Sequence, residues 1–357
     1  MHLFGDYSNG NFFRCLGRRL HFHGSVNSLN FINEIKEVDE GLTTQLQALI
    51  PKERRSQKLL RCSSLSLALS HALSRHVEAV NLIPPSDLSW DSSWINEYMD
   101  QTARMLDVGT VLTGTLSSIE QSHLLIGHAC HILFDAQKGP LGEDHACTNV
   151  CIYEEPLVRA QKSLRKWMDL EMLPGPTPRN LISNLQEMVH ALGRLRQQAF
   201  AKGHGFLYVV FGANVTAVLA FYMLSLALSE EDLLSLNFAV PPSVPWASSI
   251  SQLVHLAKNE VEEQKASGVC LEDLRRLRSC VGGLLLNIER FLESKEMPLS
   301  ASSAEQLVES LNALSSQMGE IGNALEMLRT KLDEMFSAIV LSRSVLLDKL
   351  SATEVDL

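Results

Sequence analysis

The chain has 357 residues, a formal net charge of −10 and 45% hydrophobic residues. This length allows two cores or one elongated bundle, because single domains usually contain about 50 to 250 residues. The apolar content is sufficient to bury a core, which excludes a chain that is disordered throughout. The negative charge opposes the phosphate backbone of nucleic acids, so we expect no nucleic-acid partner.

Cysteine usage and the first residues bear on the cellular compartment. The seven cysteines are odd in number and scattered along the chain, which argues against a disulfide framework and favours a reducing compartment. Residues 1–28 contain three arginines and one acidic residue, a composition that faintly resembles a transit peptide. Because this stretch lacks a clear amphipathic stripe, we predict a flexible N-terminus at 1–28, in the cytosol.

Apolar residues at helical spacing predict three helices in the first part of the chain. They cover residues 27–50, residues 63–81, and a stretch that begins near residue 92 and continues toward residue 133. Prolines follow the first two helices and cannot continue them. The basic residues between 52 and 61 are interpreted as a solvated loop, with contact to anionic lipid or to an acidic partner as the alternative.

A change in pattern then marks a boundary between helices. Residues 135–155 show little periodicity and predict a long loop, and residues 157–172 predict a fourth helix. The sequence Pro-Gly-Pro at 174–176 forbids helix continuation. We therefore predict two helical halves, at 29–173 and 179–350, followed by a tail at 351–357.

The second half begins with a predicted helix at 179–202 and continues into residues 206–228, which contain no charged side chain. About 20 apolar residues span the hydrocarbon core of a bilayer, and basic residues precede this stretch while acidic residues follow it, so a membrane span is one interpretation. The other is a buried central helix, which we favour because Asn214 and Thr216 dilute the apolar character. Gly212, Thr216 and Ala220 would let a neighbouring helix approach closely.

After three prolines between 241 and 245, the pattern predicts helices at 246–265 and 271–292. A heptad stripe follows, formed by Leu307, Leu311, Leu314, Met318, Ile321, Leu325, Leu328, Leu332, Met335 and Ile339. Such a stripe must be buried against other helices, and we expect it to pack within its own chain in a helix that extends to Leu350. The predicted fold class is all-α, an elongated multi-helix bundle with a long C-terminal heptad-patterned helix.

Signatures of enzyme chemistry are missing from the sequence. It contains no G-x-S-x-G turn, dinucleotide or P-loop glycine motif, H-E-x-x-H helix or EF-hand loop. The nearest approach to a metal cluster consists of His128, Cys130, His131, His145, Cys147 and Cys151. It lacks a C-x2-C spacing, so we expect no metal there and no catalytic, cofactor-binding or metal-binding residues. The least favoured alternative is an enzyme of signal metabolism that uses His128, His131, His145, Cys147 and Cys151.

Several blocks of sequence resemble the plant BYPASS family, which includes the ROH-type proteins. The matching stretches are residues 65–83, 93–108 with 116–133, 240–261 and 332–350, and they occur in the family order. The most specific parts are Trp94-Ile95-x-x-Tyr98-x-Asp100 and Pro242-x-x-Pro245-Trp246. The resemblance spans most of residues 29–350.

The resemblance implies an all-α plant protein without catalytic residues that works through protein partners. Relatives in one branch restrain a root-derived mobile signal that arrests shoot growth, and we expect a developmental regulator of this kind. Relatives in another branch bind the exocyst, so the alternative is a membrane-anchored adaptor of exocyst-dependent secretion. We expect the protein in the cytosol or on the cytosolic face of the endoplasmic reticulum or plasma membrane, with plastids as the less favoured alternative.

Overall fold

The computed structural model describes residues 28–51, 58–82, 92–137, 153–172, 179–202, 205–228, 231–236, 238, 240, 244–264, 270–294 and 299–355. Across these residues the chain is all helical, without a strand. The elements are α1 Ser28–Leu49, α2 Cys62–Asn81, α3 Ser92–Gln137, α4 Glu154–Met172, α5 Arg179–Lys202, α6 Gly205–Leu228, the 3₁₀-helix η2 Glu231–Ser235, α7 Ala247–Gln264, α8 Glu272–Ser294 and α9 Ala301–Val355. The predicted fold class is confirmed.

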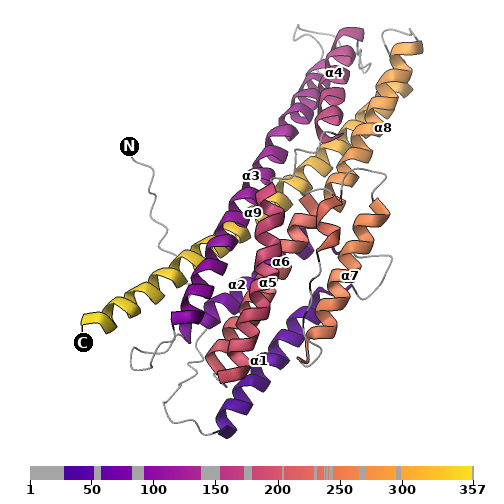
Figure 1. Cartoon of the computed structure of the whole chain (residues 1–357). Helices are drawn as coiled ribbons and strands as arrows, with labels where there is room; N and C mark the ends of the chain where they lie inside the picture. The colour runs from indigo at the N-terminus through magenta and orange to yellow at the C-terminus, as the bar shows by residue number, and fades with distance from the viewer. Residues whose placement is uncertain are drawn as a thin grey trace.

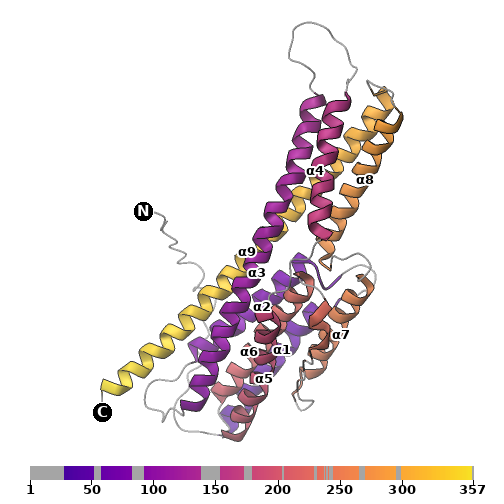
Figure 2. The ribbon, with the colours of Figure 1, turned by 45° about the horizontal axis from the view of Figure 1, so that its top comes forward.

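The two longest helices connect two differently built ends of an elongated molecule (Figures 1 and 2). α3 and α9 run along most of its length. At one end, the second half of α3 and the first half of α9 pack with α4 and α8, and we call this the four-helix end. At the other, α1, α2, α5 and α7 gather around α6, together with the remaining halves of α3 and α9, and we call this the α6 end.

The four-helix end is a closed ring, in which α3 contacts α4, α4 contacts α8, α8 contacts α9 and α9 contacts α3. Its core contains the fully buried Trp167, whose indole N–H donates to Ser122 Oγ across 3.1 Å. Outside the core, Arg165 and Glu289 form an ion pair of 2.7 Å between α4 and α8. An apolar stripe faces inward on each helix, and polar contacts close the ring outside it.

The α6 end is organised around one helix that is buried on every side. All residues from Leu207 to Ala227 are buried, and α1, α2, α3, α5 and α7 all contact α6. At Gly212 an added Cβ would lie 2.8 Å from Leu42 Cδ1, so the missing side chain allows α1 to approach closely. This contact agrees with the expectation that small residues form a close-packing face on α6.

The heptad stripe lies along the inner side of α9, and it packs within the chain against α8, α3 and α2. Nine of its ten predicted positions are buried, and Met318 is partly buried. The stripe continues past Ile339 through the buried Ser342 and Leu346. The prediction of an intramolecular seam is therefore confirmed.

α9 extends to Val355 and so includes most of the segment predicted as a tail at 351–357. Neither glycine nor proline follows Leu350, so nothing in the local sequence stops the helix there. The segment predicted as a flexible N-terminus lies outside the described residues, apart from Ser28 at the start of α1. The predicted boundary at 174–176 and most of the predicted loop at 135–155 also lie outside them, so the division into two halves stays a prediction.

Candidate functional site

The residues that resemble a metal cluster do not form one in the described part of the chain. On α3, His131 Nδ1 lies 2.9 Å from Asp135 Oδ2 on an exposed face, whereas Cys130 is buried. Burial raises the pKa of the Cys130 thiol to about 11, so it stays protonated at neutral pH. His128 is exposed, and no group of three or more ligands occurs among the described residues. The remaining candidates, His145, Cys147 and Cys151, lie outside those residues.

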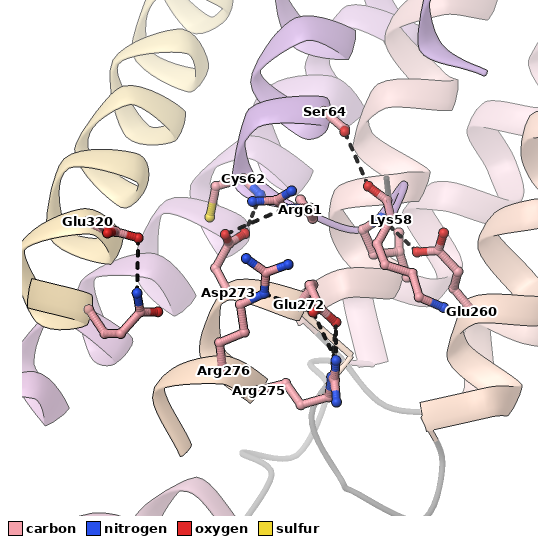
Figure 3. A network of polar contacts seen from close by, with 12 residues as sticks. Lys58, Arg61, Cys62, Ser64, Glu260, Glu272, Asp273, Arg275, Arg276 and Glu320 are labelled. Carbon is pink, nitrogen blue, oxygen red and sulfur yellow. Dashed lines mark hydrogen bonds and ion pairs between the residues drawn. The ribbon is translucent and has the colours of Figure 1, made fainter. Parts of the chain in front are cut away.

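A network of carboxylates joins the start of α2 to α7 and α8 (Figure 3), and we call it the polar clamp. Glu260 of α7 accepts hydrogen bonds from the backbone N–H groups of Leu59 at 2.7 Å and Leu60 at 2.9 Å. Asp273 of α8 accepts from the N–H of Cys62 at 2.8 Å. The N–H of Glu272 donates to the carbonyl oxygen of Leu60 at 3.0 Å. The clamp thus consists of Leu59, Leu60, Cys62, Glu260, Glu272 and Asp273.

The unpaired N–H groups and the partial positive charge at the N-terminus of α2 explain why carboxylates lie there. The first N–H groups of a helix have no partner within the helix, and its N-terminus carries a partial positive charge. Arg61, at the N-cap position of α2, makes no side-chain cap, so Asp273 from a distant part of the chain caps Cys62 instead. The clamp therefore replaces a local cap with a tertiary one.

The electrostatic state of the clamp favours a structural role. Burial raises the pKa of Glu260, although the N–H groups of Leu59 and Leu60 oppose this effect. Glu272 is also buried, but hydrogen bonds from Arg275 and Arg276 outweigh the burial and lower its pKa. Both oxygens of Glu260 and of Glu272 accept hydrogen bonds from the protein itself, which fixes the two carboxylates in place.

A second buried polar group links α2, α3 and α9. The imidazole of His76 is fully buried, with Nε2 3.0 Å from Ser342 Oγ and 3.4 Å from the hydroxyl of Tyr98. Because the Ser342 hydroxyl donates to Ile339 O, its oxygen accepts from His76, which places the imidazole proton on Nε2. Burial lowers the pKa of His76 to about 4 and raises that of Tyr98 to about 12, so both groups are neutral.

A small cavity adjoins this group, with a volume of about 10 Å³. Its lining consists of Ala79, Trp94, Tyr98, Phe206, Val210 and Leu346. Such a volume corresponds to about one water molecule and is far below the volume of a small-molecule site.

The two most specific sequence blocks supply packing residues at the α6 end. Trp94 packs edge-on against Phe206 of α6. Trp246 is fully buried, and its indole N–H donates to Asp39 Oδ1 of α1 at 2.8 Å. The same oxygen accepts from the hydroxyl of Tyr208. These residues hold α1, α3 and α7 against α6.

The apolar helix α6 bears on the two interpretations of residues 206–228, a membrane span and a buried central helix. Among the described helices, α6 alone is long and apolar enough to cross a membrane, over Phe206–Leu228. The structure buries its apolar window completely within the bundle, as the favoured interpretation predicts. Neighbouring helices and not lipid therefore cover α6 in this arrangement.

Sequence reasoning missed two sets of residues. The acids of the polar clamp carry no sequence signal, because Glu260 lies about 200 residues from its partners. Four exposed apolar residues on the C-terminal part of α9 were also missed: Phe336, Val340, Leu341 and Leu347. They lie off the heptad stripe, and large apolar residues at off-stripe positions are the signal that could have found them.

Comparison with known proteins finds similarity to plant proteins. Residues 183–350 match a family model described as "Protein ROH1-like". UPF0496 protein 4 from Oryza sativa, in both subspecies indica and japonica, is 24% identical over 268 residues, which is 73% of this chain and 56% of the rice protein. The chain thus spans little more than half the length of these rice relatives.

A third relative matches almost end to end. "Protein BPS1, chloroplastic" from Arabidopsis thaliana is 22% identical over 349 residues, which is 97% of this chain and 90% of the Arabidopsis protein. No solved structure gives a significant match. The resemblance is confirmed: residues 183–350 match the ROH1-like family model, and the chain shows distant homology to BPS1 over nearly its whole length and to the UPF0496 proteins over about three quarters of it.

Proposed function

We propose that this protein is a non-enzymatic regulator of plant development that acts through contacts with other proteins. Following the BYPASS resemblance, its role would be to restrain a root-derived mobile signal that arrests shoot growth. The proposal rests on the hydrogen bonds that the buried ionisable side chains make within the fold. Burial shifts the pKa values of Glu260 and His76, as it often does for catalytic groups, yet each side chain is hydrogen-bonded to another part of the fold.

Grafting and rescue in plants test this role. Roots that lack the gene should arrest a wild-type shoot, and expression of the wild-type chain in those roots should restore its growth. A variant with His128, His131, Cys147 and Cys151 replaced by alanine or serine should rescue equally well. If that variant accumulates normally but fails to rescue, the enzyme alternative becomes the better account. If roots without the gene leave the shoot unaffected, the proposed signal is wrong.

A second function is an adaptor of exocyst-dependent secretion. The match of residues 183–350 to the ROH1-like model supports it, because the sequence resemblance links the ROH-type relatives to the exocyst. Affinity purification of the tagged chain from plant tissue, followed by mass spectrometry, distinguishes the two. Stoichiometric recovery of exocyst subunits would support the adaptor, and their absence from complexes that contain other partners would support the first proposal.

We place the protein in the cytosol or on the cytosolic face of the endoplasmic reticulum or plasma membrane. The burial of α6 supports a peripheral attachment, so alkaline carbonate should release the protein from membranes. Resistance to carbonate, with Arg194 and Glu230 protected on opposite sides, would instead show that α6 spans the membrane. The name of the Arabidopsis relative includes chloroplastic, so an import assay with isolated chloroplasts is the matching test. A shortened, protease-protected product would overturn the cytosolic proposal.

A further inference from the structure

The outward side of α9 changes character along its length. In the first half it presents mainly polar side chains, such as Glu305, Glu309 and Glu326. In the last third, large apolar side chains are almost half exposed: Phe336 at 43%, Val340 at 45%, Leu341 at 49% and Leu347 at 49%. The inner stripe of α9 is already buried, so this second apolar set is additional to what the fold requires.

Three of these residues lie on the flank of α9 that faces α3. Arg329 pairs with Glu120 of α3 at 2.9 Å, and Arg343 Nη1 lies 2.8 Å from Thr102 Oγ1, also on α3. Phe336 is seven residues from each arginine and therefore shares their side of the helix. Val340 and Leu347 follow at steps of four and seven, on the same side. We call Phe336, Val340 and Leu347 the outer flank.

Acidic side chains accompany the outer flank. Asp333 is exposed one turn before Phe336 and two turns before Val340, and Asp348 is exposed next to Leu347. Two basic side chains of α9 near this strip are engaged elsewhere, since Lys331 pairs with Glu334 and Arg343 reaches α3. The chain as a whole carries a net charge of −10. The apolar strip is therefore bordered by negative charge.

We propose that the outer flank is a docking surface for a basic amphipathic helix of a partner protein. The apolar spacing over three turns suits a helix that contributes anchors at i, i+4 and i+7, and lysine or arginine beside those anchors would face Asp333 and Asp348. A second copy of this chain would bring like charges together, and an anionic lipid surface would be repelled for the same reason. This inference rests on the proposed function, because it names the surface through which a partner would be held.

Peptide binding to the full-length chain tests the surface directly. The probe is a fluorescent three-heptad peptide with leucine at the a and d positions and lysine elsewhere, and the matched peptide carries glutamate in place of lysine. Fluorescence anisotropy at physiological salt should show binding of the lysine peptide alone. Phe336→Asp and Val340→Asp should each weaken that binding at least tenfold. Leu286→Asp, at a 63% exposed apolar position on α8, is the matched control and should leave the affinity unchanged.

Phe336→Ser provides a milder variant if Phe336→Asp fails to fold, and circular dichroism checks both. The proposal is overturned if the lysine and glutamate peptides bind alike, or if Leu286→Asp weakens binding as much as Phe336→Asp. It is also overturned if phosphatidylserine vesicles compete for the outer flank, or if the wild-type chain forms a dimer that Phe336→Asp abolishes. Failure of the peptide test alone refutes this surface, whereas failure of the grafting test refutes the proposed function.

Discussion

The four-helix end and the α6 end bury their cores in different ways. At the four-helix end each helix has an inner and an outer side, so Leu124 of α3 is 72% exposed while Leu133 of the same helix is fully buried. At the α6 end, the central helix has no outer side at all between Leu207 and Ala227. At the four-helix end, the effect of a substitution on stability should therefore depend on whether it lies on the inner or the outer face of its helix. Along α6, substitutions should be strongly destabilising at every position.

This difference also changes how polar groups are accommodated. In α6, Asn214 Nδ2 donates to Val210 O at 2.8 Å, and Thr216 Oγ1 donates to Ala213 O at 2.9 Å, so both side chains bond to their own helix. At the four-helix end, polar side chains bond between helices, as Asn287 does to Ser310 at 2.9 Å. Asn214 and Thr216 thus satisfy donors within α6, whereas Tyr208 and Tyr222 of the same helix reach Asp39 and the carbonyl oxygen of Leu233, because a buried polar group without a partner is costly.

The largest expected effect is that of a charge in the centre of α6. Val218→Arg places a guanidinium that cannot deprotonate at a fully buried position, and the cost should be comparable to the whole stability of a domain, about 5–15 kcal/mol. The variant should be insoluble or lack a cooperative thermal transition by circular dichroism. Leu124→Arg, on the exposed side of α3, should melt like the wild type. A soluble Val218→Arg protein with a normal transition would show that α6 is not surrounded.

On α9, two neighbouring positions test whether the cost depends on the face. Leu325 is fully buried in the heptad stripe, whereas Met327 is 51% exposed. Leu325→Asp should lower the free energy of unfolding by about 4 kcal/mol, less than the arginine in α6 because a carboxyl can take up a proton. Met327→Asp should change it by less than about 0.5 kcal/mol. Urea denaturation measures both, and equal losses would contradict the intramolecular seam.

The two ends share one pH-sensitive feature, a buried neutral histidine. Burial lowers the pKa of His76 at the α6 end and of His123 at the four-helix end to about 4, while an unfolded histidine titrates near 6.5. Between these values the unfolded chain binds protons that the folded chain does not, so stability should fall as the pH falls from 6.5 to 4. For His76 the loss is on the order of 3 kcal/mol.

Urea denaturation at pH 7 and pH 4.5 measures this loss. His76→Gln should reduce the pH dependence because the titrating group is removed. Ser342→Ala removes the hydrogen-bond partner of His76 but keeps the imidazole, so the pH dependence should persist in this control. An unchanged pH dependence in His76→Gln would assign the effect to other groups.

The smallest predicted effect concerns the polar clamp. Glu260→Ala leaves the buried N–H groups of Leu59 and Leu60 without their acceptor and should cost about 1–3 kcal/mol. Glu263→Ala removes only the outer ion pair with Lys58 and should cost less than about 1 kcal/mol. Urea denaturation of the two variants gives the comparison. If Glu263→Ala is the more damaging variant, the clamp does not depend on Glu260.

Periodicity predicted the helices well, because it is a property of short segments. The bounds predicted for residues 179–202 match α5, and the predicted helix at 63–81 differs from α2 by one residue. The stop near Leu350 was wrong because the local sequence contains no helix breaker. No candidate site residue was predicted, and the residues of the polar clamp and of the outer flank carry no local motif.

The amino-acid sequence by itself determined the all-α class, the heptad seam of α9 and the uniform apolar character of α6, because these depend on residues a few positions apart. Only the tertiary structure decided that Glu260 meets Leu59 and Leu60, that His76 meets Ser342, and that Phe336 and Val340 stay exposed. These pairings and exposures depend on how helices far apart in the chain are placed together. A periodic pattern specifies which side of a helix is buried, but not which helix covers it.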